Sequence, residues 1–188
     1  MEYSAIIQQA CLNIDSNEEM AQSIIENDYP FCPIKYQKRG ITASDTLKVF
    51  VRDGFIDRYF GTRMIYPPVL RILSYKFPNQ FPYHPNWKMD SCHIAYWELV
   101  PTLDHVVPIA RGGANTIDNI VCTSMLHNSI KSNYTLEQIG WQLRPSGNFH
   151  EWDGMIHWYI SYIEAHPQLK SFQYFKSHYN LARRELRG

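Results

Sequence analysis

The sequence predicts an α+β protein in which a small antiparallel hairpin and the helix after it form one unit, with other helices on both sides. Two apolar stretches, "TLDHVVPIA" and "NIVCTS", are short enough to be strands, and the loop "RGGANTID" between them contains a Gly-Gly pair. The next segment, "SMLHNSIKSN", favours a helix with Thr123 or Ser124 as its N-cap. Together these segments predict a β-β-α unit.

Residues 1–45 are expected to form a helical arm that is rich in acids. An apolar stripe of one helix is made of Ile6, Ile7, Ala10 and Cys11. Ser16 suits the N-cap of a second helix, because Glu18 and Glu19 would lie in its first turn. Pro30 and Pro33 are expected to end this arm.

Residues 46–140 are expected to form the core around the β-β-α unit. A helix is predicted to begin at Ser44 and to end at Gly54. The segment "DRYFGTRMIY" then suggests a hairpin that turns at Gly61 and Thr62. The prolines that open "PPVLRILSYKF" suit the first turn of another helix.

The stretch from Pro78 to Pro101 is rich in proline and aromatic residues, so we expect a packed loop with a short helix at 93–97. Residues 141–188 are expected to form a helical extension that packs on the core, giving one compact unit of about 140 residues behind the front arm. The apolar faces of this extension are Ile156, Tyr159, Ile160 and Ile163, and then Phe172, Phe175, Tyr179, Ala182 and Leu186.

The composition is that of a globular protein, because 45% of the 188 residues are hydrophobic and 14% are aromatic. Apolar runs fall short of the roughly 20 residues that a membrane span requires, and "MEYSAIIQQA" lacks the features of a signal peptide. We therefore expect a cytoplasmic protein with no membrane partner. Four cysteines, at positions 11, 32, 92 and 122, form no C-x-x-C pair and are expected to be reduced thiols.

Charge is balanced over the whole chain but is unevenly distributed. The sequence has 18 Lys and Arg and 18 Asp and Glu. Residues 1–30 hold six of the acids and no Lys or Arg, so residues 31–188 carry an excess of six positive charges. An excess of this size permits contact with phosphates without requiring it.

The β-β-α unit gathers side chains that suit the hydrolysis of phosphodiesters. Asn128 and Lys131 are three residues apart and share a helix face, and the hairpin is expected to bring Asp104 and His105 opposite that face. Carboxylate and amide oxygens are ligands for Mg²⁺ or Mn²⁺. An imidazole, whose ordinary pKa is about 6.5, can take a proton from an attacking water. An ammonium group can stabilise charge on the leaving oxygen.

This set of residues resembles the HNH nuclease motif of the ββα-metal superfamily. The matching positions are Asp104, His105, Gly112, Gly113, Asn119, Asn128 and Lys131, and the resemblance extends from about Phe50 to Asn133. It implies that His105 is the general base and that Asp104 and Asn128 are metal ligands. It also implies that Asn119 supports the loop and orients the base.

Many HNH proteins also hold a structural zinc with two C-x-x-C pairs, and here the sequence departs from that pattern. The corresponding positions are Asp57, Phe60, Ser124 and His127. These residues cannot build a zinc cage, so we expect no structural zinc and expect the stretch Phe81–Trp97 to fasten the upstream turn by packing. His127 itself is expected to be a solvated helix residue, because successive helical side chains point in different directions.

The resemblance implies a metal-dependent endonuclease that cuts DNA, most simply double-stranded DNA, and leaves 5′ phosphate and 3′ hydroxyl ends. Arg111 and Lys131 are the candidates for contact with nucleic-acid phosphates. RNA stays open as a substrate, because attack by an external water does not depend on the sugar. One HNH site cuts one strand at a time, so a double-strand break would require a homodimer or two encounters.

Two other roles stay open. In the first, the β-β-α unit only grips nucleic acid and has no catalytic activity. In the second, the protein is an effector of a defence or toxin system that a partner activates, and the acidic residues 1–30 cover a basic cleft until they are displaced.

Overall fold

The chain divides into two compact units, Met1–Tyr36 and Gln37–Gly188. The computed structural model describes residues 2–31 and 40–187. None of the helices in these two ranges is both long enough and apolar enough to cross a membrane.

The smaller unit is a pair of packed helices, α1 (Tyr3–Asn13) and α2 (Glu18–Asp28). Its buried side chains are Ile6, Ala10 and Ala21. The predicted stripe is therefore narrower than expected, since Ile7 and Cys11 are exposed. The expected N-cap, Ser16, is wrong by one residue: the Asn17 side chain accepts the hydrogen bond from the Met20 backbone N–H at 3.1 Å.

The larger unit combines helices with one small sheet, and the predicted α+β class is confirmed. Its helices are α3 (Ala43–Arg52), α4 (Pro67–Lys76), α5 (Ala95–Glu98), α6 (Met125–Lys131), α7 (Ile156–Ala165) and α8 (Gln173–Glu185). Its strands are β1 (Pro101–His105) and β2 (Ile120–Ser124), and short 3-10 turns lie at η1 (Ile109–Arg111), η2 (Ile117–Asn119) and η3 (Pro167–Ser171).

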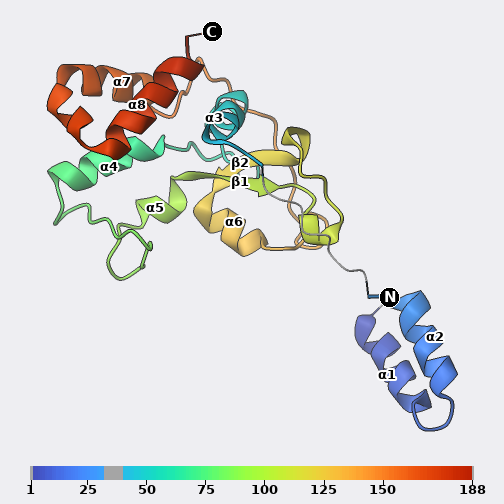
Figure 1. The fold of residues 1–188 in the computed structure, drawn as a ribbon. Coiled ribbons are helices and arrows are strands. Elements are labelled where there is room, and N and C mark those ends of the chain that lie inside the picture. Colours follow the sequence, from blue (N-terminus) through green and yellow to red (C-terminus); the bar gives the residue numbers. More distant parts are fainter. Residues whose placement is uncertain (1, 32–39, 188) are drawn as a thin grey trace. The chain divides into compact units, whose positions relative to one another are not determined.

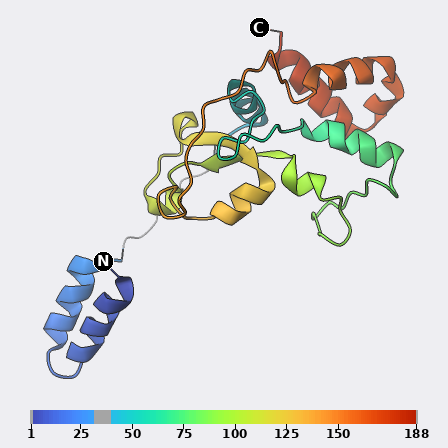
Figure 2. The same cartoon turned by 180° about the vertical axis from the view of Figure 1, so that it is seen from behind.

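The two strands pair antiparallel, with Pro101 opposite Ser124 and His105 opposite Ile120. Helix α6 follows β2 directly and contacts both strands. It begins there because the Ser124 hydroxyl accepts a hydrogen bond from the His127 backbone N–H at 3.0 Å, which makes Ser124 the N-cap. Helices α3 and α6 lie on opposite sides of the strand pair (Figures 1 and 2).

Helix α3 is fastened to β2 by the buried carboxylate of Asp53, directly after its last residue. This carboxylate accepts a hydrogen bond from the Cys122 backbone N–H at 2.8 Å. It also pairs with the guanidinium of Arg58 at 2.7 Å and with that of Arg52 at 2.9 Å. The buried charge is thus compensated by two cations and a backbone donor.

The hairpin expected in "DRYFGTRMIY" does not form strands. Among the described residues, this segment has a single bridge, between Ile56 and Arg63, around a turn that the Asp57 N–H closes on the Thr62 carbonyl at 2.8 Å. The turn instead bonds to the rest of the unit, because the Arg58 N–H donates to the Cys122 carbonyl at 2.9 Å. Tertiary bonds therefore replace the expected local ladder.

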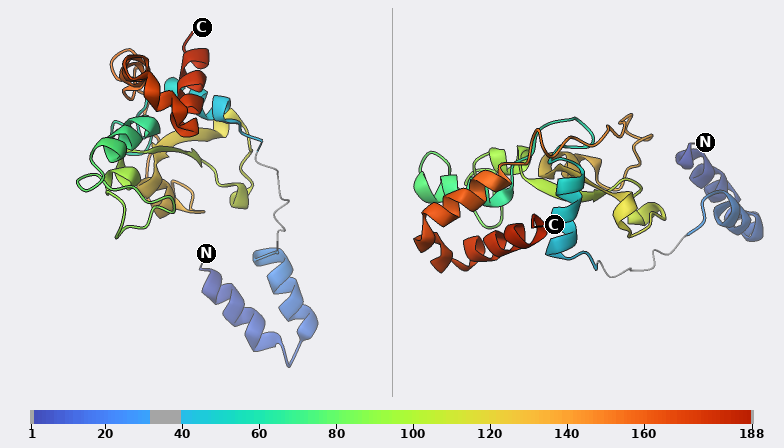
Figure 3. Two further views of the ribbon diagram at one scale, coloured as in Figure 1. Left: turned by 60° about the vertical axis from the view of Figure 1, so that its left-hand side comes forward. Right: turned by 90° about the horizontal axis from the view of Figure 1, so that it is seen from above.

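The main core joins α3, α4, α7 and α8 (Figure 3). The first apolar face predicted for residues 141–188 is confirmed, since Ile156, Tyr159, Ile160 and Ile163 are all buried. The second predicted face is only partly buried. Phe175 and Ala182 are buried, but Phe172 is 45% exposed because it lies just before α8, at the end of η3.

The aromatic loop after α4 forms a second, smaller core. Phe81, Tyr83 and Trp87 pack against Leu70, Cys92, Tyr96 and Val100. The expectation that this stretch fastens the turn at 57–62 is therefore wrong, because its rings pack on α4 and α5 instead.

Candidate active site

The loop between the two strands takes its shape from two glycines and one asparagine. Gly112 has a φ of +84°, and a Cβ on Gly113 would lie 1.8 Å from the Val107 carbonyl oxygen. The Asn119 amide spans the loop: its oxygen accepts from the Val107 N–H at 2.9 Å, and its nitrogen donates to the carbonyls of Val107 at 2.9 Å and Ala114 at 2.8 Å. Asn119 thus supports the loop through the backbone and not through the His105 ring.

The His105 imidazole stands at the end of β1 and is held by Asn115. Its Nε2 lies 3.0 Å from the Asn115 side-chain oxygen. An amide oxygen only accepts hydrogen bonds, so this contact assigns the proton to Nε2 and leaves the Nδ1 lone pair as a base. The sequence did not single out Asn115. Its position in the Gly-Gly loop, which follows the strand that carries the expected base, is the feature from which it could have been predicted.

Asp104 is held by two donors on one carboxylate oxygen. Its Oδ2 accepts from the Tyr59 hydroxyl at 2.5 Å and pairs with the Lys131 ammonium at 2.8 Å. Burial, together with the nearby charge of Asp104, raises the pKa of Tyr59 far above its usual value, so this hydroxyl stays protonated and donates. The other oxygen, Oδ1, has no donor among the described residues. Tyr59 was not expected in the site, because 45 residues separate it from Asp104.

Lys131 lies inside the protein, with none of its surface exposed. Besides Asp104, its ammonium bonds to the His105 carbonyl at 2.7 Å. It therefore joins the last turn of α6 to the end of β1. The direct contact with phosphate that the sequence predicts is not available to a side chain in this position.

Asn128 lies beside the same strand. Its amide nitrogen donates to the carbonyl of Leu103, the residue before Asp104, at 3.2 Å. This bond leaves the Asn128 Oδ1 without a donor among residues 2–31 and 40–187. Asp104 and Asn128 thus each offer an oxygen of the kind that Mg²⁺ or Mn²⁺ binds, and water would supply the remaining ligands. Within the same ranges, no group of three or more His, Cys, Asp or Glu side chains is arranged to hold a metal.

Asp57, Phe60, Ser124 and His127, the four positions compared above with zinc ligands, do meet in space, around the carboxylate of Asp57. Asp57 is fully buried. Its oxygens accept hydrogen bonds from the backbone N–H groups of Tyr59, Phe60 and Ser124, from the Thr123 hydroxyl, and from the His127 ring at 2.7 Å. We name this arrangement the Asp57 cluster. It joins the turn at 57–62 to β2 and α6.

Aromatic rings cover the Asp57 cluster. The His127 ring stacks on Phe60 with ring centres 4.0 Å apart, and Trp141 meets Phe60 edge-on at 4.8 Å. The expectation of a solvated His127 is therefore wrong. That expectation followed from the direction of the His127 side chain on α6. The turn at 57–62, which packs against the same side of the helix, was not part of it.

Arg111 is exposed at the end of η1, where its Nε donates to the Asn133 carbonyl at 3.3 Å. Its guanidinium is thus tied to the segment after α6, and Arg111 itself lies in the loop that carries Asn115.

Comparisons of the chain with models of protein families, with curated proteins and with solved structures find no match.

Proposed function

We propose that this protein is a metal-dependent endonuclease of the HNH type that hydrolyses phosphodiester bonds in DNA, built on a ββα-metal core of β1, β2 and α6. The observation that carries the proposal is the placement of Asp104, Asn128 and His105. On β1 and the helix packed against it lie two oxygens without donors, and an imidazole with one unpaired nitrogen, as judged over the residues that the structure describes. A protein that binds nucleic acid without cleaving it would need none of these three side chains in such positions.

In the proposed reaction, a water attacks the phosphorus while the Nδ1 of His105 takes its proton. The bond from phosphorus to the 3′ oxygen breaks, and that oxygen takes a proton from solvent. The products are a 5′ phosphate and a 3′ hydroxyl. Asn115 fixes the ring through Nε2, so the unused nitrogen faces a constant direction.

Asp104 and Asn128 fit a divalent ion through the oxygens described above. Such an ion, Mg²⁺ or Mn²⁺, would stabilise the negative charge that develops on the phosphate and on the leaving oxygen. Tyr59 and Lys131 hold the Asp104 carboxylate in place. In this proposal Lys131 positions a ligand rather than contacting phosphate, and Arg111 is an exposed cation within the loop between β1 and β2.

The test is a supercoiled-plasmid assay with Mg²⁺, Mn²⁺ or EDTA, at neutral and mildly alkaline pH. Nicked circles should appear with either metal and not with EDTA. An intact plasmid under all conditions, with protein that binds DNA, would favour the non-catalytic module instead. A parallel assay on single-stranded RNA establishes whether DNA is preferred.

Replacing Tyr59 with phenylalanine should weaken activity without removing it. The change deletes one of the two donors to Asp104 and leaves the ring in place, so the carboxylate is less firmly oriented. Loss of such a supporting bond typically costs about 10- to 100-fold in metal affinity or activity. The dependence of nicking rate on Mg²⁺ concentration should shift to higher concentration, whereas Tyr134→Phe, at an exposed tyrosine, should not shift it. An unchanged Mg²⁺ dependence in Tyr59→Phe would remove Tyr59 from the site.

Deleting residues 2–30 should raise the rate of cleavage at low salt. This segment carries six acids and no Lys or Arg. It should therefore repel DNA, or compete with DNA for binding to residues 31–188, which carry a net positive charge. The gain should vanish at high salt, where charges are screened. A full-length variant with the six acids changed to Asn or Gln should behave like the deletion. Equal rates for all three proteins at low salt would show that the acids do not regulate cleavage.

A further inference from the structure

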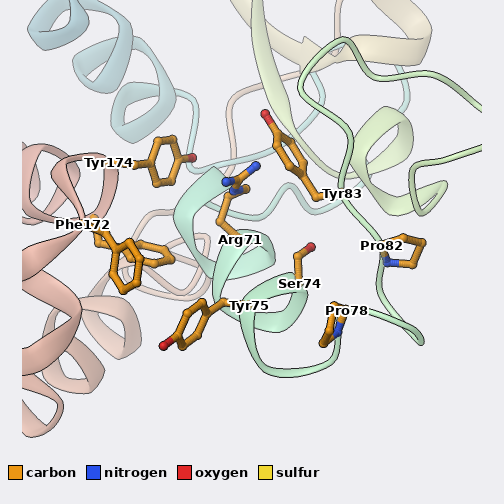
Figure 4. A pocket seen from close by; sticks show the side chains of 9 residues that line it. Arg71, Ser74, Tyr75, Pro78, Pro82, Tyr83, Phe172 and Tyr174 are labelled. Atoms are coloured by element: carbon orange, nitrogen blue, oxygen red, sulfur yellow. The ribbon is translucent and has the colours of Figure 1, made fainter.

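A half-open pocket of about 360 Å³ lies between α4, the loop that follows it, and the start of α8 (Figure 4). The side chains that define its walls are Arg71, Tyr75, Pro82, Tyr83, Phe172 and Tyr174. We name it the α4–α8 pocket. It shares no residue with the candidate active site, and its volume is within the range of roughly 300–1,000 Å³ typical of small-ligand sites.

The cation in this pocket has aromatic neighbours but no acidic partner. The Arg71 guanidinium extends from α4 between two rings, 3.4 Å from the centre of Tyr83 and 5.2 Å from that of Tyr174 (Figure 4). Its Nη1 is buried and has no hydrogen-bond partner within the described ranges 2–31 and 40–187. Among the residues that the structure describes, no Asp or Glu lines the pocket or pairs with Arg71.

The buried donor of Arg71 without an acceptor indicates a site for an anion. Buried donors in folded proteins nearly always have an acceptor, so an exception requires an explanation. Ring contacts hold the guanidinium in one orientation, but they satisfy none of its N–H groups. An anion bound at the guanidinium would supply a counter-charge, and a small movement of the surrounding rings that uncovers Nη1 would let it supply the acceptor as well. Phosphate and carboxylate match the fork of a guanidinium well.

The other walls indicate the rest of the ligand. Tyr75, Phe172 and Tyr83 present rings from three segments of the chain, and Pro82 adds a flat apolar side. Such surfaces favour a planar aromatic group, because bases stack on aromatic side chains with little regard to their identity. The pocket thus combines a surface for a flat ring with a cation for an anion.

We propose that the α4–α8 pocket binds one nucleotide, with its base against the ring walls and its phosphate at the guanidinium of Arg71. The choice of a nucleotide over other aromatic anions rests on the proposed function, because a nuclease meets nucleotides in its substrate and its product. The nucleotide is either free or part of a DNA strand. Both present the same chemistry to Arg71.

The experiment is calorimetric titration of the full-length protein with the four deoxynucleoside 5′-monophosphates, the matching deoxynucleosides, and inorganic phosphate. Monophosphates should bind, and nucleosides and phosphate should bind at least tenfold more weakly. Arg71→Met should weaken monophosphate binding about 10- to 100-fold, the range for loss of a hydrogen bond to a charged group. The matched control is Arg63→Met, at an exposed arginine 5.1 Å from the Trp152 ring and outside the pocket, which should bind as wild type.

A second measurement does not depend on the folding of a variant. In wild-type protein, titration with a monophosphate should shift the ring resonances of Tyr83 and Tyr174, and a short single-stranded oligonucleotide that competes for these shifts would identify DNA as a source of the nucleotide. Inorganic phosphate that binds as tightly as the monophosphates, or monophosphates that leave these resonances unmoved, would overturn the proposal.

Plasmid cleavage separates this proposal from the proposed function. Cleavage without monophosphate binding would remove the pocket's role and leave the nuclease. Monophosphate binding that Arg71→Met abolishes, in a protein that cuts no plasmid, would support the pocket and contradict the nuclease.

Discussion

Replacing His105 with alanine should abolish metal-dependent nicking while the protein still folds and still binds DNA. The substitution removes the proposed base and leaves both proposed metal ligands. A positioned general base typically contributes about 10²- to 10⁴-fold to a rate, so nicking should fall by about that factor in a time course on supercoiled plasmid. Folding should survive, because the ring of His105 is only partly buried and the contact with Lys131 uses its backbone carbonyl.

The matched control is His157→Ala. This histidine is exposed and pairs with Asp153 at 2.7 Å on α7, so its loss should leave nicking unchanged. Asn115→Ala should give a smaller loss than His105→Ala, because the base remains but its ring is no longer held. If His105→Ala cuts plasmid at the wild-type rate, another group takes the proton. If its circular dichroism spectrum shows an unfolded chain, His105 is a structural residue.

Replacing Asp57 with alanine should produce the largest loss of stability of any single substitution considered. The change leaves the hydrogen-bond donors of the Asp57 cluster, including the His127 ring, without their shared acceptor. Each buried donor left unsatisfied typically costs about 1–3 kcal/mol, so the total is a large part of the stability of a typical domain. Unfolding in urea, followed by circular dichroism, measures the loss. Asp45→Ala, at a half-buried aspartate whose side chain accepts a hydrogen bond from the backbone N–H of the α3 N-cap Thr42, should lose much less.

Replacing Asp57 with asparagine should change how stability depends on pH. Burial raises the pKa of Asp57, but hydrogen bonds from the His127 ring and from the backbone of Ser124 and Tyr59 outweigh it, so the net shift is below the ordinary value of 3.8. A lowered folded-state pKa stabilises the protein above that ordinary value, and this contribution disappears as the pH falls through the folded-state pKa. Wild type should therefore lose stability in acid more steeply than Asp57→Asn. Parallel pH profiles would show that the carboxylate of Asp57 is not the group responsible.

The sequence predicted the elements whose signals are local. Both strands, helix α6 with a cap at Thr123 or Ser124, and the buried face of α7 follow from apolar periodicity and capping chemistry; all are present, and the cap is Ser124. The relation of Asp104 to Lys131 was predicted only in part. The sequence indicated that the two side chains lie near one another, but it did not indicate that Lys131 is buried and supports the carboxylate. Burial depends on what packs around a side chain, which local patterns do not describe.

The contacts that sequence reasoning missed all join distant segments. Tyr59 reaches Asp104 across 45 residues, and His127 reaches Asp57 across 70. The hairpin expected at Gly61 failed for the same reason, because the backbone of this segment bonds to β2 rather than to itself. The residue spacing within a single helix or strand cannot predict contacts between segments so far apart in the sequence.

The Asp57 cluster has a practical consequence for experiments with chelators. In a protein whose turn and catalytic helix are clamped by a structural ion, EDTA both stops the chemistry and loosens the scaffold, so lost activity has two explanations. Here hydrogen bonds to one carboxylate join the turn, β2 and α6. Chelation and re-addition of Mg²⁺ should therefore switch the proposed nuclease activity off and on within a folded protein, and the melting temperature should change little between the two states.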